Sequence, residues 1–80
     1  MFNLFKKLKA KKALLITIEK VGFSARTYNC LRRVGITMLG ELAGMRKCDL
    51  YKIRNLGKRN IEEIDNKLQE NGLKLIEENN

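Results

Sequence analysis

Apolar residues in the second half of the chain recur every three or four positions, which is the spacing of a helix that buries one face. This pattern predicts the longest helix of the protein, beginning after Gly57 and ending at Gly72. The buried stripe of this helix should comprise Ile61, Ile64 and Leu68. Further apolar residues follow the helix, and we expect them to fold back as a tail: Leu73, Leu75 and Ile76.

A second helix is predicted over residues 25–34, where Ser24 is a favourable N-cap and Gly35 can end the helix in the left-handed conformation. One apolar stripe is predicted to enter the core: Ala25, Tyr28, Leu31 and Val34. Residues at positions i, i+3, i+4 and i+7 lie on another face of the helix: Arg26, Asn29, Cys30 and Arg33.

Two shorter helices are predicted between these two. Thr37 can cap a helix over residues 38–43, which Gly44 ends. Another helix should span about residues 47–54, where Asp49 in the first turn suits the helix dipole and two residues face inward, Leu50 and Ile53. The earlier segment, residues 14–23, has β-branched residues and no helical stripe, so we expect it to be extended.

Together these patterns predict an all-α fold, a compact bundle of short helices, four to five in number, with helix-hairpin-helix-like turns. Eighty residues suffice for one domain. We expect a basic lead over residues 1–14, a folded domain over residues 15–76 and an acidic tail over residues 77–80. The lead is either disordered or a weak amphipathic helix built on Phe2, Phe5 and Leu8.

The amino-acid composition limits the classes of partner and activity that the protein can have. The net charge of +8 and a pI near 9.8 favour an anionic partner, either nucleic acid or a membrane surface. The chain has no histidine, and its two cysteines lack zinc spacing, so we expect no metal, no cofactor and no enzymatic activity. No apolar run reaches membrane-spanning length, and no signal peptide is recognised, which predicts a cytoplasmic protein.

The cations are concentrated in two regions. Five lysines fall within the first twelve residues, and a lead of this kind could lie on an anionic membrane surface without stable insertion. A second basic set follows later in the sequence: Arg46, Lys47, Lys52, Arg54, Lys58 and Arg59. The plainer interpretation of both sets is a solvated helix face, and we expect Lys52 and Arg54 to be peripheral.

A weak internal repeat gives the later cations a context. "LRRVGITMLGEL" aligns with "KIRNLGKRNIEEI", with Gly35 over Gly57, and each copy has the pattern of a helix-hairpin-helix. A glycine turn lets the backbone approach phosphate, and the free N–H groups of the next helix can bind it. Only the second copy adds cations, Lys58 and Arg59, so it is the copy predicted to face phosphate. Helical hairpins of this kind also occur in protein-binding modules.

Two longer motifs resemble a known family. "SARTYNCLRRVGI" and "DLYKIRNLGKRNIEEIDNKLQENGLKL" are similar to the C-terminal domain of the bacterial RNA polymerase alpha subunit, over roughly residues 18–75. The resemblance implies a SAM-like bundle of short helices without catalytic activity, acting in transcription. It also implies binding to A·T-rich upstream promoter DNA through the minor groove, and contact with RNA polymerase, sigma factor or regulators. Such a protein would be associated with the bacterial nucleoid.

The resemblance assigns DNA contacts to particular residues: Arg26, Asn29, Cys30, Gly57, Lys58, Arg59, Asn60 and Glu63, with Arg33 and Asn55 as further candidates. It implies that Arg26 enters the minor groove, whose negative potential in A·T-rich DNA attracts arginine. The Gly57 amide and Arg59 would hold phosphate, while Glu63 would orient Arg26 or a neighbouring donor. Asn60 stands where the family usually has serine.

Alternatives remain open. The protein could belong to a polymerase, or it could be a free regulator, because a methionine and a basic lead stand where the family has a linker and an assembly domain. It could also be a protein-interaction module that keeps the fold without binding DNA. The plainer interpretation of Cys30 is a small, half-buried residue.

Overall fold

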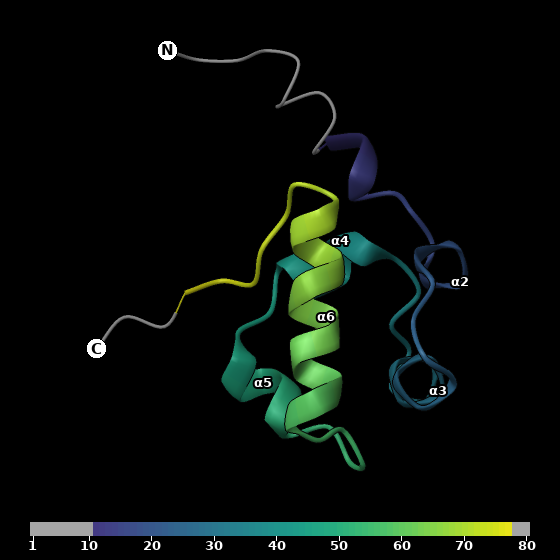
Figure 1. Ribbon diagram of the computed structural model, residues 1–80, viewed down its shortest axis with the longest axis vertical. Coiled ribbons are helices and arrows are strands. Elements are labelled where there is room, and N and C mark those ends of the chain that lie inside the picture. The colour runs from purple at the N-terminus through teal and green to yellow at the C-terminus, as the bar shows by residue number, and fades with distance from the viewer. Residues whose placement is uncertain (1–10, 78–80) are drawn as a thin grey trace.

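The computed structural model describes residues 11–77, and within this range the protein is helical. The helices are α2 (Ile18–Val21), α3 (Ala25–Arg33), α4 (Leu39–Ala43), α5 (Lys47–Tyr51) and α6 (Lys58–Glu70), shown in Figure 1. Residues 11–13 are also helical. Two isolated bridges, between Thr17 and Met38 and between Arg46 and Ile76, are the only β pairing in the described range. The predicted all-α bundle is therefore confirmed.

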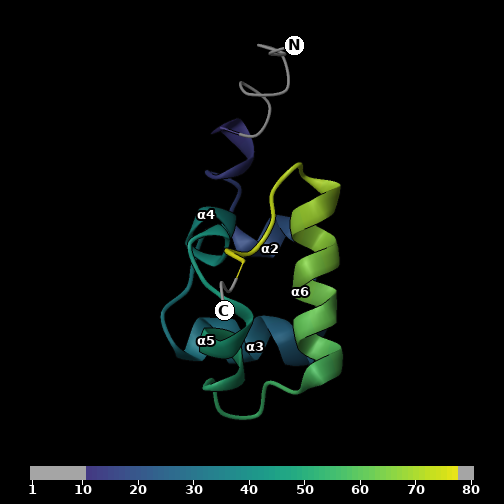
Figure 2. The ribbon, with the colours of Figure 1, turned by 90° about the vertical axis from the view of Figure 1, so that its left-hand side faces the viewer.

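Helix α6 is the longest helix, and the shorter helices lie on one side of it, with α3, α4 and α5 in contact with it (Figures 1 and 2). Helix α3 crosses α6 near the N-terminal end of α6, as Figure 2 shows from the side. Helix α5 and the turn that follows it lie at this same end of the molecule (Figures 1 and 2). Three segments that are separate in the sequence thus meet where α6 begins.

The core is made almost entirely of aliphatic side chains. The predicted stripe of α6 is fully buried, and each of the other helices contributes at least one leucine or isoleucine to the same cluster: Ile18, Leu31, Leu39, Leu42, Leu50, Ile61, Ile64 and Leu68. Leu75 of the C-terminal tail completes it, so the tail folds back as expected. Removal of such side chains from water is the main source of stability for a domain of this size.

The segment predicted to be extended contains a short helix instead. Helix α2 covers four residues and ends at Gly22, whose φ of 89° is left-handed. Ile18 is buried in the core, and its N–H donates to the Thr37 carbonyl at 3.0 Å. Tertiary packing of Ile18 outweighs the β preference of its neighbours, which is only a weak local tendency.

The buried face of α3 differs from the predicted stripe. Ala25 is exposed and Val34 is 50% exposed, whereas Thr27, Cys30 and Leu31 are buried. The helix is therefore rotated relative to the prediction. Thr27 can be buried because its hydroxyl has hydrogen-bonding partners on α6.

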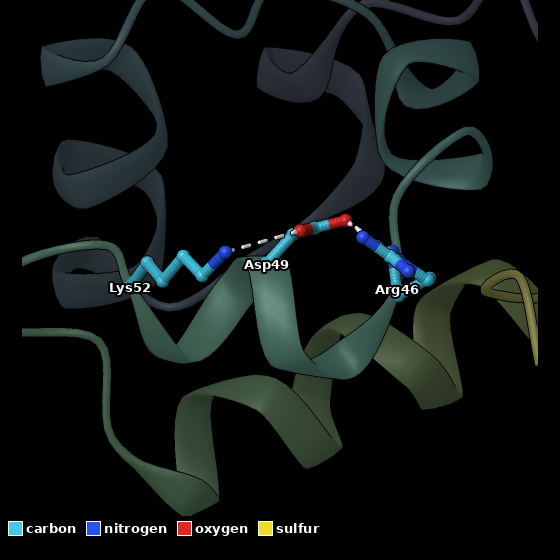
Figure 3. A network of polar contacts seen from close by, with 3 residues as sticks. All are labelled: Arg46, Asp49 and Lys52. Carbon is cyan, nitrogen blue, oxygen red and sulfur yellow. Dashed lines mark hydrogen bonds and ion pairs between the residues drawn. The ribbon is translucent and has the colours of Figure 1, made fainter. Parts of the chain in front are cut away.

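Helices α4 and α5 are close to their predicted bounds, but their first turns are organised differently. The N-cap of α4 is Met38 rather than Thr37, and the Glu41 carboxylate accepts from the backbone N–H groups of Thr37 and Met38, at 2.6 and 2.8 Å. In α5, the Asp49 carboxylate accepts hydrogen bonds from the Arg46 backbone N–H and from the Arg46 guanidinium (Figure 3). Its other oxygen, Oδ1, lies 3.9 Å from the Lys52 Nζ atom. Helix α5 ends at Tyr51, earlier than predicted, and Ile53 still packs against the core.

The two glycines of the internal repeat have different conformations. Gly35 has a φ of 85° and follows α3 in the left-handed region, as predicted. Gly57 has a φ of −93° in extended backbone and is itself the N-cap of α6. The left-handed residue of the second copy is Asn55, with a φ of 69°, and asparagine tolerates this region better than most residues. The two copies thus share the buried pairs Leu39/Ile61 and Leu42/Ile64, but they differ in their turns and in the residue before the glycine, where Val34 is 50% exposed and Leu56 is buried.

The segment before α2 packs against α4. The Leu14 carbonyl accepts from the Gly40 N–H at 3.0 Å, and the Ile16 carbonyl accepts from the Leu39 N–H at 2.8 Å. Ala13 is buried, so packing extends back at least to this residue. The apolar residues on which an amphipathic lead is predicted, Phe2, Phe5 and Leu8, lie outside the described residues.

Candidate nucleic-acid interface

A shallow hollow of about 470 Å³ lies where α3, the end of α5 and the start of α6 meet. Its lining comprises Arg26, Tyr51, Lys52, Ile53, Arg54, Asn55, Leu56, Gly57 and Asn60. We call this surface the α3–α6 hollow. Three of its residues are cationic and none is acidic, so the charged side chains that line the hollow are all positive.

The arginines of the hollow have no carboxylate partner among residues 11–77. Within residues 11–77, the ion pairs join Arg46 and Lys52 to Asp49, Lys67 to Glu70, and Lys74 to Glu77. No acidic partner is present in this range for Arg26 or Arg54. Arg59, on the first turn of α6, is likewise exposed and without an ion pair among these residues.

A network of hydrogen bonds joins the start of α3 to the start of α6. Glu63 accepts from the Ser24 hydroxyl at 2.8 Å and from the Thr27 hydroxyl at 2.6 Å. The Asn60 amide donates to the Thr27 oxygen at 2.9 Å, and Glu63 also accepts from the Ser24 N–H at 2.5 Å. These contacts hold α3, and with it Arg26, at one position relative to α6.

Ser24 occupies the predicted N-cap position, but its hydroxyl donates to Glu63 and makes no capping bond within α3. The Glu63 carboxylate instead binds the Ser24 hydroxyl and backbone N–H from the neighbouring helix. The resemblance implies that Glu63 orients Arg26 or a neighbouring donor, and the hydrogen bonds of Glu63 in the structure run to other residues than Arg26. Its partners are Ser24 and Thr27, which lie on either side of Arg26 in the sequence.

The expected phosphate donor at Gly57 is already engaged. The Gly57 N–H donates to the Asn60 side-chain oxygen at 3.1 Å, a contact made by the asparagine that replaces the usual serine. The first intrahelical bond of α6 runs from the Ile61 N–H to the Gly57 carbonyl, at 3.0 Å. Among the described residues, the N–H groups of Lys58, Arg59 and Asn60 have no acceptor, so these are the amides open to an anion.

The pKa of Glu63 follows from this network. Partial burial alone would raise the pKa of the carboxyl, but hydrogen bonds from Thr27 and Ser24, with a contribution from Lys67, lower it below its usual value of 4.5. A pKa that is lower in the folded than in the unfolded state means that the ionised group stabilises the fold. This stabilisation is present above pH 4.5 and is lost as the pH falls through the lowered pKa.

Replacing Glu63 with glutamine should therefore lower the free energy of unfolding at neutral pH by about 1–2 kcal/mol, because a charged acceptor is lost. The difference from the wild type should shrink as the pH falls below 4.5, where Glu63 itself becomes protonated. Urea unfolding at pH 7 and pH 3 measures both values. Glu62→Gln is the control, because Glu62 is exposed at the preceding position of α6 and should change little. A constant deficit at both pH values would contradict this account.

Of the other residues that the resemblance assigns as DNA contacts, some lie on the surface and one lies in the core. Asn29, Arg33, Lys58 and Arg59 are exposed, outside the lining of the hollow. Cys30 is 6% exposed, and its thiol donates to the Asn55 carbonyl at 3.6 Å, so its side chain belongs to the core and anchors the turn.

Three polar or charged residues of the hollow lie outside the set of DNA contacts that the resemblance implies: Tyr51, Lys52 and Arg54. Tyr51 is 55% exposed, and it lines the hollow together with Lys52 and Arg54, which the sequence analysis places at the periphery. The sequence does contain one indication that Arg54 belongs to the hollow, because Arg54 directly precedes the "NLG" motif. Within the described residues, no cluster of side chains suits a metal ion, and no helix has the length and apolar character needed to cross a bilayer.

Comparisons with known proteins agree with this architecture. Residues 6–70 match the sequence profile of the C-terminal domain of the alpha chain of bacterial RNA polymerase. An alpha subunit of DNA-directed RNA polymerase from Clostridium perfringens is 52% identical over 67 residues, which represent 84% of this protein and 21% of the relative. An alpha subunit from Clostridium beijerinckii is 49% identical over 72 residues, which represent 88% of this protein and 23% of that relative. The protein thus spans about a fifth of the length of these relatives.

A solved structure shows the same fold. The NMR structure of the C-terminal domain of the RNA polymerase alpha subunit from Helicobacter pylori matches with a TM-score of 0.74 and 38% identity, over 82% of this protein and 58% of that one. The profile, the relatives and the fold lead to one assignment. The protein belongs to the family of C-terminal domains of the bacterial RNA polymerase alpha subunit.

Proposed function

We propose that this protein is a non-catalytic DNA-binding domain that acts in bacterial transcription and recognises A·T-rich duplex through the minor groove. In this proposal Arg26 enters the groove, where the negative potential of A·T-rich DNA is strongest. The N–H groups and side chains at the start of α6 hold the phosphate backbone, which positions the domain without reading sequence.

The observation that carries the proposal is the charge of the α3–α6 hollow. It gathers Arg26, Lys52 and Arg54 with Gly57 and Asn60, and it has no carboxylate in its lining. The nearby acid Glu63 directs its oxygens to Ser24 and Thr27. The surface therefore offers an anion several donors without a carboxylate in its lining.

The polar residues of the interface have two kinds of role in this proposal. Arg26, Lys58 and Arg59 contact DNA, with Asn29, Arg33 and Asn55 at the edge of the contact surface. Asn60 and Glu63 act indirectly, by holding the two helices together. Possession of the fold further suggests RNA polymerase, sigma factor or a transcription regulator as protein partners, in the cytoplasm at the nucleoid.

Arg26→Ala should weaken binding to an A·T-rich duplex by about tenfold or more and remove the preference for A·T-rich over G·C-rich DNA. Fluorescence anisotropy with labelled duplexes of both kinds, at several salt concentrations, measures both effects. Wild-type affinity should fall steeply with salt, because phosphate contacts release counterions.

Arg32→Ala is the matched control. Arg32 is an exposed arginine of the same helix and has no ion pair in the described range, but it does not line the hollow. It should change affinity far less than Arg26→Ala. If the wild type and Arg26→Ala bind A·T-rich duplex equally, the proposal is wrong. Capture of polymerase or sigma factor without any salt-sensitive DNA binding would instead support a protein-interaction module.

A further inference from the structure

We infer that Arg54 is a second phosphate-binding arginine, which extends the DNA contact of the α3–α6 hollow from α3 and α6 onto the turn after α5. This inference rests on the proposed function and names an additional residue of the same site. It differs from the sequence-based expectation, in which Arg54 is peripheral.

The position of Arg54 places it in the same site as Arg26. Arg54 lines the same hollow as Arg26, although the two residues are distant in the sequence. Arg26 belongs to α3, whereas Arg54 belongs to the turn that leads from α5 into α6 (Figures 1 and 2). A ligand seated in the hollow would therefore meet an arginine from each of these two segments.

The turn that carries Arg54 is held in place by hydrogen bonds and by packing. The Ile53 N–H donates to the Leu50 carbonyl at 3.0 Å, and the Leu56 N–H donates to the Ile53 carbonyl at 3.2 Å. Leu56 is buried, and the Asn55 carbonyl accepts from the Cys30 thiol at 3.6 Å. A cation on a fixed backbone loses less conformational freedom when it binds a partner, because part of that cost is met during folding.

The positive charge of Arg54 is not paired with a carboxylate among the described residues. Lys52, on the same turn, lies 3.9 Å from Asp49, whereas Arg54 is exposed and has no acidic partner among residues 11–77. Its guanidinium is free to bind two phosphate oxygens at once, which a lysine cannot do in the same way. The hollow has no carboxylate in its lining, so no anionic acceptor competes there with a phosphate for the Arg54 guanidinium.

The test compares the 80-residue wild type with Arg54→Ala, Arg54→Lys and the control Arg32→Ala. Binding to A·T-rich and G·C-rich duplexes is measured by anisotropy over a range of salt concentrations. Arg54→Ala should reduce the slope of log affinity against log salt by about 0.9, the value for one phosphate contact. A fourfold dilution of salt should then raise the wild-type affinity about 3.5-fold more than that of the variant.

Arg54→Ala should weaken binding to both duplexes by the same factor, because phosphate carries no sequence information. Arg54→Lys should restore most of the salt slope, and circular dichroism should show all variants folded. If Arg26→Ala loses affinity while Arg54→Ala behaves like Arg32→Ala, the inference is wrong and the proposed function stands. If the wild type shows no salt-sensitive binding to duplex, both are wrong.

Discussion

Replacing Leu31 with alanine is expected to lower the free energy of unfolding by about 2–5 kcal/mol. Leu31 is 0% exposed and belongs to the central cluster of apolar side chains. Its truncation removes buried apolar surface and leaves a cavity that the surrounding structure can only partly fill. Because a small domain is stable by only about 5–15 kcal/mol, this change could remove much of the total. Urea unfolding followed by circular dichroism measures the loss.

Leu15→Ala provides the matched control, because the same atoms are removed from a side chain that is 70% exposed. Its effect should stay within about 0.5 kcal/mol, as is usual for surface positions.

The comparison also tests the rotation of α3. Val34, placed in the core by its hydrophobic pattern, is half exposed, so Val34→Ala should resemble Leu15→Ala. A loss at Val34 equal to that at Leu31 would contradict the observed face of the helix.

Gly40→Ala should also destabilise the protein, by about 1–3 kcal/mol, although alanine is normally the better residue within a helix. A Cβ atom at this position would lie 2.7 Å from the Leu14 carbonyl oxygen and 3.1 Å from the Leu14 Cβ. The Gly40 N–H donates to that same carbonyl at 3.0 Å, so the segment before α2 cannot move away without losing the bond. Thermal unfolding should show a midpoint lower by about 4 °C or more.

Gly44→Ala is the appropriate comparison, since it adds the same methyl group at the other end of α4. The nearest atom to a Cβ there is the Glu41 carbonyl oxygen at 3.6 Å, an ordinary contact, and the φ of −92° suits any residue. Its midpoint should change little or rise slightly. Equal effects at the two glycines would show that close approach to Leu14 is not what Gly40 provides.

Sequence pattern predicted α6 best, because its apolar residues Ile61, Ile64 and Leu68 recur at helical spacing over about two turns and leave one consistent face. It failed for α2, whose four residues are too few to show a period. It favoured the wrong face of α3 because Thr27 is polar, and its burial depends on Glu63 and Asn60, which are far away in the sequence. Such long-range partners leave no local signal.

The candidate site was predictable to a similar degree. The sequence places Arg26, Gly57 and Asn60 in one contact surface, and all three line one hollow. The pattern could not show that the Gly57 N–H would be taken by Asn60, because that depends on a side-chain rotamer. Nor could it place Arg54, whose position depends on the left-handed conformation of Asn55 and on the packing of the turn.

The hydrogen bonds between Ser24 and Glu63 join residues 39 positions apart, with α4 and α5 enclosed in the intervening loop. The interface is therefore discontinuous, and it is assembled only when this loop has closed. Loop closure costs conformational entropy that neither helix can offset on its own. Excised peptides corresponding to α3 or α6 would lack the geometry of the whole, so recognition here is a property of the folded protein and not of a transferable segment.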